Sequence, residues 1–243
     1  APFFTKKKLA QIKTEMENLC HDILEEIPNL KFDLITNFSQ KFPVMVIAKM
    51  LGIPEQMAPQ LVKWSNDMVA MYQARRNDEI EKKAVTATKE FSHFIRSLIH
   101  EKNLNPSEDL ISYLLGARSC TNRITEDEMV STMILLLNAG HEATVHTISN
   151  GLKTILESRF ELTDLMKIPT KLSSEILRFA TPLHMFTRYC TKELNFFGQQ
   201  LHTGDRIGLL LAAANRDPDH FINPEEFNPF INRKTSVSPG AGI

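Results

Sequence analysis

The stretch Ala139-Gly140-His141-Glu142-Ala143-Thr144 lies inside the longest helical pattern of the chain, and it decides the fold. A glycine within a helix costs about 1 kcal/mol relative to alanine, so Gly140 needs a reason to be there. Two reasons fit this position. Either a second helix packs closely against Gly140, or a flat and bulky ligand lies along the helix beside it. The stretch alone leaves both explanations open.

The helix around this stretch is predicted over about 125–157. Thr125 and Glu128 have the spacing of a capping box, which marks a helix start. Several residues then share one side of the helix at steps of three and four, as expected for a face directed inward. These residues are Met129, Met133, Leu136, Leu137, Gly140, Thr144 and Ile148.

Helical periodicity dominates the chain before residue 180, and a short-period pattern follows it. Helices are predicted over about 6–27, 39–51, 54–72, 78–101, 109–115 and 169–180. Short strands are predicted over 189–197, 199–202 and 207–214, with turns at Gly198 and Gly204. We therefore predict a mainly α protein with a single domain over 1–243. Its helices would occupy about 6–180, and a β region and a proline-rich meander would occupy about 184–243.

Composition limits the classes of function. The chain is 42% hydrophobic and 23% charged, with a net charge of −1, so no overall field attracts nucleic acid or an anionic membrane. No apolar run approaches the roughly 20 residues that span a bilayer. Cys20, Cys120 and Cys190 are far apart and odd in number, which is typical of a reducing compartment. We expect a cytoplasmic protein that contacts neither nucleic acid nor membrane.

A second motif is Glu175-x-x-Arg178. Residues at i and i+3 share a helix face and can form an ion pair. Taken by itself, such a pair is most often a surface contact worth under about 1 kcal/mol.

In combination, these motifs resemble the cytochrome P-450 family of haem-thiolate monooxygenases, and its soluble bacterial type in particular. The resemblance covers nearly the whole chain. The ordered matches are Ala1–Thr5, Phe32–Leu34, Pro43–Ala48, Leu51–Pro54, Ala139–Glu142, Glu175-x-x-Arg178, Arg188, Gly198, Gly204-Asp205, Ala214–Pro218, Phe221, Pro224 and Phe227. The resemblance implies a partial cytochrome P-450 fold and haem as the cofactor.

The resemblance also implies roles for residues near the haem. Ala139 and Gly140 would leave room over its distal face, and Arg188 would pair with a propionate through a charge-assisted contact. Glu142 matches the acidic residue that relays protons during dioxygen activation. The family usually has threonine next, but here that position is Ala143. The hydroxyl of Thr144 comes one residue later, about 100° around the helix, so it cannot simply replace the usual one.

Further positions carry over to the substrate pocket and to the structural core. Leu136, Leu137, Leu183 and Met185 would line a pocket for a small apolar substrate. Glu175 and Arg178 match two members of a structural triad, and Arg233 is the candidate for the third.

The chain departs from the family at both ends. The family's proximal loop reads Phe-Gly-x-Gly-x-x-x-Cys-x-Gly, whereas this chain has Pro239-Gly240-Ala241-Gly242-Ile243, without the thiolate that favours O–O cleavage. The family's first helices would precede Ala1. The family activity is monooxygenation of a small apolar substrate with dioxygen and an electron-transfer partner, and we do not expect this chain to support it alone. The alternative is a haem-free truncated relative that acts as a binding or interaction module.

The missing segments also lead to an expectation about association. Without haem and flanking helices, apolar surface would be exposed, so we expect self-association through the haem-side surface. His141 and His146 are not expected to bind zinc. They are five residues apart, and zinc-binding histidines on one helix need a spacing of four.

Overall fold

The computed structural model describes residues 6–27, 31–73, 76–121, 124–233 and 236–237. The chain forms two compact units, residues 1–145 (unit 1) and 146–243 (unit 2). Whether they fold as the single domain that the sequence predicts stays a prediction. The described residues are mainly helical, with a small β region in unit 2, and this confirms the predicted fold class. No helix among the described residues is long and apolar enough to cross a membrane.

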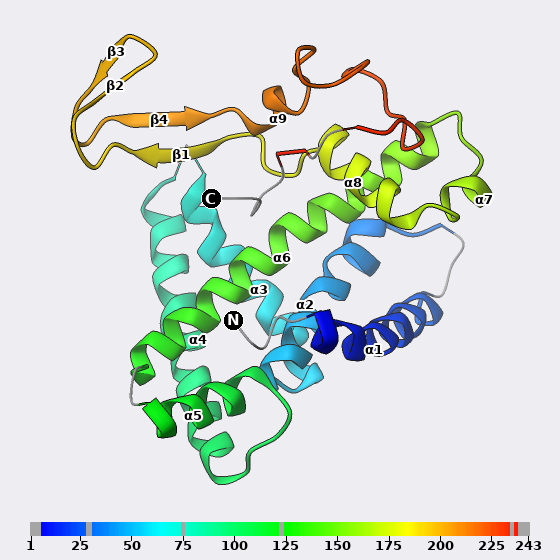
Figure 1. The fold of residues 1–243 in the computed structure, drawn as a ribbon. Helices are drawn as coiled ribbons and strands as arrows, with labels where there is room; N and C mark the ends of the chain where they lie inside the picture. Colours follow the sequence, from blue (N-terminus) through cyan, green and yellow to red (C-terminus); the bar gives the residue numbers. More distant parts are fainter. Residues whose placement is uncertain (1–5, 28–30, 74–75, 122–123, 234–235, 238–243) are drawn as a thin grey trace. The chain divides into compact units, whose positions relative to one another are not determined.

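The regular elements described in unit 1 are all helices (Figure 1). Its elements, in chain order, are α1 (Lys6–Glu25), the π-helical turn η2 (Ile35–Ser39), α2 (Lys41–Leu51), η3 (Glu55–Met57), α3 (Ala58–Val69), η4 (Ala70–Tyr72), α4 (Asp78–Leu104), α5 (Leu110–Thr121) and the first part of α6 (Glu126–Glu157). The predicted 54–72 helix is three helical pieces, and the predicted 109–115 helix extends to Thr121.

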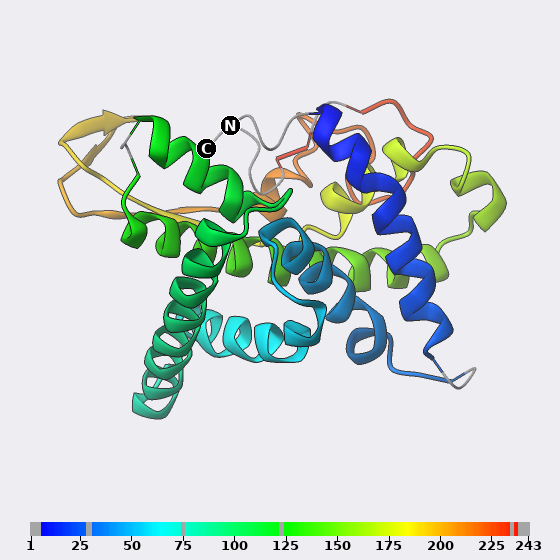
Figure 2. The same cartoon turned by 90° about the horizontal axis from the view of Figure 1, so that it is seen from below.

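The core of unit 1 forms where α2, α3, α4 and α6 turn their apolar faces to one another. α3 packs against α4 and crosses it at a large angle (Figure 2). Trp64 from α3 contacts Phe91 from α4 with ring centroids 5.5 Å apart, and its indole N–H donates to Glu90 Oε2 at 2.8 Å. The buried indole thus has both apolar contacts and a hydrogen-bond partner.

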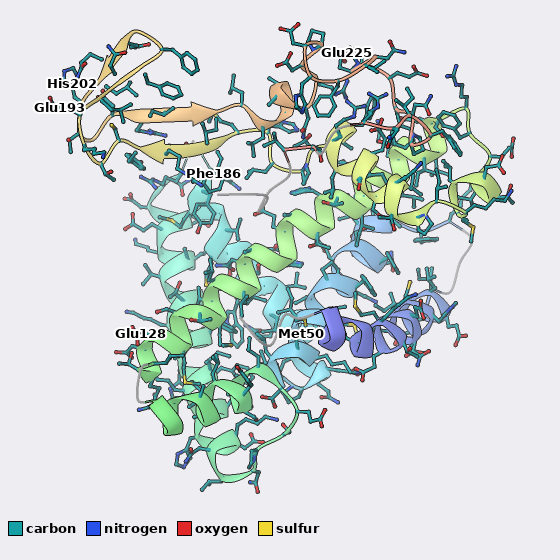
Figure 3. All side chains as sticks on the ribbon, viewed as in Figure 1. Met50, Glu128, Phe186, Glu193, His202 and Glu225 are labelled. Atoms are coloured by element: carbon teal, nitrogen blue, oxygen red, sulfur yellow. The ribbon has the colours of Figure 1, made fainter. Side chains whose placement is uncertain are left out.

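The start of α6 agrees with the capping box predicted from the sequence. Glu128 N–H donates to Thr125 Oγ1 at 3.2 Å, and Thr125 N–H donates to Glu128 Oε2 at 2.7 Å. Two amides that the helix cannot pair internally are satisfied in this way. Glu128 is labelled at this end of α6 in Figure 3.

Unit 2 contains the end of α6 and the whole β region. Its other elements are α7 (Leu162–Leu165), α8 (Pro169–Phe179), β1 (Phe186–Tyr189), β2 (Leu194–Phe196), β3 (Gln199–Leu201), β4 (Arg206–Leu209) and α9 (Leu211–Ala214). β1 pairs antiparallel with β4, and the β2–β3 hairpin lies between them in sequence. Glu193 and His202 flank this hairpin (Figure 3).

Two predicted strands have different bounds in the structure. The 189–197 strand is interrupted, because buried Cys190 exchanges backbone hydrogen bonds with the 204–205 turn. The 207–214 strand ends at Leu209, and the residues after it form α9. Pairing with β1 sets this limit, since Leu209 is opposite Phe186, the first residue of β1.

Candidate functional site

The central motif on α6 divides into a buried face and an exposed face. Leu137 and His141 are almost completely buried, whereas Ala139 and Glu142 are exposed. A rotation of about 100° per residue separates the two faces. Ala139 and Glu142 are three residues apart and therefore lie on one side of the helix, as the predicted roles of both require.

On α2, the side chain of Ile47 lies against Gly140 of α6. A Cβ atom at Gly140 would lie 2.8 Å from Ile47 Cδ1. Close helix packing therefore accounts for the missing side chain, as one of the two explanations from the sequence states. A contact between Gly140 and haem stays a prediction.

His141 ties α6 to two other segments of unit 1. Its Nδ1 lies 3.2 Å from Ser65 Oγ, and its Nε2 lies 3.3 Å from the backbone oxygen of Gln40. A backbone oxygen only accepts, so Nε2 carries the proton and Nδ1 accepts from the Ser65 hydroxyl. The sequence motif contained this histidine but did not indicate its anchoring role, because its partners are remote in the chain.

The other residues predicted on α6 have different surroundings. The Thr144 hydroxyl donates to Gly140 O at 2.8 Å within the helix. Leu136 is half-buried against the core, and Leu137 belongs to that core. Contact of Leu136 or Leu137 with substrate stays a prediction. Leu135 is 65% exposed and lies one turn before Ala139, and the sequence analysis missed it.

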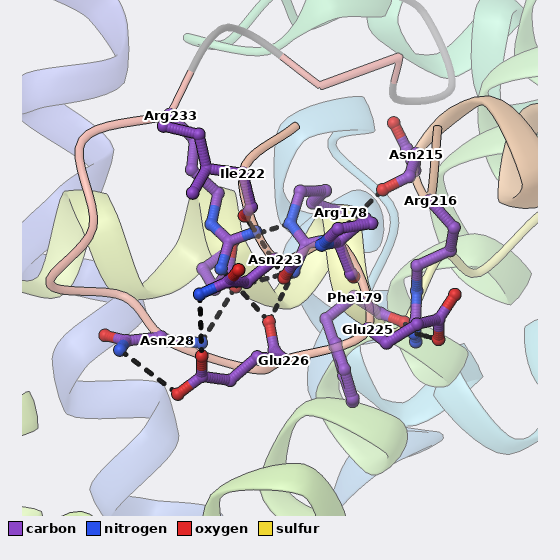
Figure 4. Close-up of polar contacts among 12 residues, drawn as sticks. Arg178, Phe179, Asn215, Arg216, Ile222, Asn223, Glu225, Glu226, Asn228 and Arg233 are labelled. Atoms are coloured by element: carbon purple, nitrogen blue, oxygen red, sulfur yellow. Dashed lines mark hydrogen bonds and ion pairs between the residues drawn. The ribbon is translucent and has the colours of Figure 1, made fainter. Parts of the chain in front are cut away.

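In unit 2, Arg178 is the centre of a buried polar network (Figure 4). Its Nε and Nη2 donate to the two carboxylate oxygens of Glu175, both at 2.8 Å. Nη1 donates to the backbone oxygens of Asn215 at 2.9 Å and Pro224 at 2.7 Å, and Nη2 donates to that of Glu226 at 2.8 Å. All five N–H donors of the guanidinium are used. The pair is thus a buried structural centre and not the surface contact that its spacing alone favours.

Arg233 lies in the same network. Its Nε is 3.7 Å from Glu175 Oε2, and its Nη1 donates to Ile222 O at 2.7 Å and Asn223 O at 3.1 Å. Burial lowers the pKa of the Arg233 guanidinium, while the Glu175 carboxylate opposes that shift. The structure therefore brings the three predicted structural residues together.

Arg188, Leu183 and Met185 lie in or just before β1. The guanidinium carbon of Arg188 is 4.2 Å from the ring centroid of Phe186, the residue labelled on β1 in Figure 3. Met185 is half-exposed, and its Sδ would be 3.2 Å from a Cβ atom at Gly208 of β4. Leu183 is half-buried.

The described residues fit a haem in part. In unit 1, Leu135 and Ala139 form an open apolar strip on α6. In unit 2, the one hydrogen bond of the half-buried Arg188 guanidinium within the described part of the chain is a 3.5 Å bond to Thr187 O, so Arg188 retains donors for a carboxylate. Neither described cysteine is suited to be a thiolate ligand. Cys190 donates its S–H to Lys192 O at 2.8 Å, and burial raises the pKa of the Cys20 thiol. Cys120 lies among the residues whose side chains are not described.

Each unit also contains a cavity away from the predicted site residues. One, of about 550 Å³, lies in unit 1 beside Ile99 and Leu115, and the other, of about 370 Å³, lies in unit 2 beside Thr181 and His184. None of the residues predicted for the site lines either cavity.

Comparison with known proteins places this mainly helical fold and its buried Glu-x-x-Arg centre in one class. The family model described as Cytochrome P450 matches residues 153–234. Polyketide biosynthesis cytochrome P450 PksS of Bacillus subtilis is 31% identical over 99% of this chain and 59% of its own length. Steroid C26-monooxygenase of Mycobacterium tuberculosis is 27% identical over 98% of this chain and 65% of its own length.

Solved structures agree. Mycobacterium smegmatis CYP164A2 with econazole bound superposes with a TM-score of 0.90 at 28% identity, over 98% of this chain and 62% of that one. P450BioI in complex with a ligated acyl carrier protein gives a TM-score of 0.86 at 29% identity, over 93% of this chain and 60% of that one. The chain belongs to the cytochrome P450 family. It spans about 60% of the length of the relatives that it matches.

Proposed function

We propose that this chain is the central part of a bacterial-type haem-thiolate monooxygenase, which oxidises a small apolar substrate with dioxygen and electrons from a redox partner. The observation that carries the proposal is the buried Arg178 network with Glu175 and Arg233, within the region that the family model matches. Such a network is costly to bury and is retained only where its partners are complete. The alternative of a haem-free binding module has no comparable supporting feature.

In this proposal the chain's own residues bind and orient the cofactor and substrate. Ala139, with Gly140 behind it, provides a flat apolar surface for the haem, and Arg188 pairs with a propionate. When bound, the haem supplies the dioxygen and electron-transfer chemistry. The thiolate is not supplied by any cysteine whose side chain is described.

The remaining predicted residues handle substrate and protons. Leu136, Leu137, Leu183 and Met185 give apolar surface that suits a small apolar substrate, and the exposed Leu135 adds to it. Exposed Glu142 moves protons between solvent and the pocket. The Thr144 hydroxyl bonds within its own helix, so Glu142 carries more of this task than it would beside a threonine at position 143.

The test uses the full open reading frame that contains this chain. The expressed protein is expected to bind haem stoichiometrically and to give the Soret band of a thiolate-ligated haem when reduced under carbon monoxide. Arg188→Leu should lower haem retention, whereas Arg206→Leu, a matched change at an exposed arginine on β4, should not. A protein that binds no haem, or that gives no thiolate-type band, would contradict the proposal.

We also propose that the protein is cytoplasmic and that the chain, produced alone, self-associates through the exposed apolar strip at Leu135 and Ala139. Exposed apolar surface of this kind favours association. Sedimentation velocity should give species larger than a monomer, and Leu135→Gln should restore the monomer. A monodisperse wild-type chain that binds no apolar dye would count against self-association.

A further inference from the structure

Asn215 is a buried polar residue for which the proposed function assigns no role. It follows α9 directly, and its side chain has no exposed surface. Burying an amide is unfavourable unless its hydrogen-bonding groups are paired, so its partners indicate what it does. Figure 4 labels it beside Arg178.

The side-chain amide of Asn215 pairs with both backbone groups of one remote residue. Its Oδ1 accepts from Val237 N–H at 2.8 Å, and its Nδ2 donates to Val237 O at 2.9 Å. The second N–H of Nδ2 donates to Thr181 Oγ1 at 3.0 Å. Because Val237 N–H only donates and Val237 O only accepts, the orientation of the amide is determined.

Asn215 also connects Val237 to the buried polar network around Arg178. Its backbone oxygen accepts from Arg178 Nη1, and Thr181 Oγ1 donates to Arg178 O at 2.8 Å. Val237 is therefore joined to Arg178 by two short routes, one through Asn215 alone and one through Thr181.

Apolar packing does not explain the position of Val237. The residue is 39% exposed, so burial stabilises this segment only weakly. The two amide hydrogen bonds, each directional and short, define where the backbone lies.

We propose that Asn215 is a positioning residue that holds residues 236–237 against the Arg178 network, at the point from which the chain continues into 238–243. This inference rests on the proposed function only in its consequence. In the proposed enzyme, Asn215 would stiffen this part of unit 2 by joining residues 236–237 to the Arg178 network.

The test is amide hydrogen exchange of the full chain, resolved for individual residues. Asn215→Leu keeps the approximate shape and removes both bonds to Val237. Loss of two hydrogen bonds is expected to speed exchange of the Val237 amide by about tenfold. The internal control is the Asn228 amide, which donates to Glu175 Oε1 at 2.9 Å in the same network. Exchange of the Asn228 amide should change much less than exchange of the Val237 amide.

Two further variants sharpen the result. Thr181→Val removes the Thr181 hydroxyl but leaves both Val237 bonds, so Val237 should stay protected. The second variant, Asn215→Ser, has a polar side chain that is too short to reach Val237. It replaces Asn215→Leu if the leucine variant does not fold.

Equal acceleration of the Val237 and Asn228 amides would mean that Asn215 only contributes to general stability, and no acceleration would mean that it holds nothing. Either result overturns the inference. The exchange measurement needs no haem, so its failure is distinguishable from failure of the proposed function.

Discussion

Replacing Arg178 with lysine is expected to destabilise unit 2 strongly although the charge is kept. Arginine donates five hydrogen bonds here, to Glu175 and to three backbone oxygens. Lysine has three N–H donors, so at least two of these bonds are lost. At about 1.5–3 kcal/mol for each bond that involves a charged group, the free energy of unfolding should fall by about 3–6 kcal/mol.

The assay is thermal and urea unfolding, followed by circular dichroism. A loss of about 4 kcal/mol should lower the Tm by roughly 10 °C for a chain of this size. The matched control is Arg159→Lys, because the Arg159 side chain is 74% exposed and bonds to Glu226 at 2.6 Å. An exposed pair of this kind is worth about 0–1 kcal/mol.

The comparison between the two variants decides the matter. If Arg178→Lys costs no more than Arg159→Lys, the buried network is not the structural centre of unit 2. The argument from satisfied donors would then be wrong. A large loss for both variants would instead show that the hydrogen-bonding geometry of arginine matters as much at the exposed Arg159 as at the buried Arg178.

Three further predictions concern unit 1 and its control positions. Gly52→Ala should cost more than about 2 kcal/mol, because φ is +76° and the new Cβ would collide with the Asp109 carboxyl, whereas Gly198→Ala, at φ +80° in open space, should cost only about 1 kcal/mol in the same urea titration. Burial alone would raise the pKa of Asp109, but hydrogen bonds from Ser107, the Ser112 amide and Lys102 outweigh it and hold the pKa below its usual value. The folded state therefore gains stability above the unfolded pKa and loses it as pH falls through the lower folded pKa. Wild type should lose stability more steeply than Asp109→Asn below about pH 4, and parallel curves would contradict this. Thr125→Ala removes one half of the capping box and should cost about 1 kcal/mol in urea unfolding, with Thr132→Ala on the exposed helix surface as the control and equal losses as the contrary result.

Much of the helical architecture could be predicted from local sequence signals. The capping box at Thr125 predicted the start of α6 to within one residue, and helical periodicity over about 6–27 predicted α1, in which Leu19 and Ile23 are buried. These signals are local, because caps and helix periodicity involve residues within about one turn of each other. Strand ends were less predictable, since partner strands determine them.

The sequence by itself determined the family and the residue types of the candidate site, because motifs are defined by the order and spacing of residues along the chain. Only the tertiary structure decided what each polar residue contacts. Hydrogen bonds join His141 to Ser65 and Gln40, and they join Asn215 to Val237. In each case the partners are remote in sequence. No local pattern encodes such pairs, because they arise when separate elements pack together and each buried donor must find an acceptor.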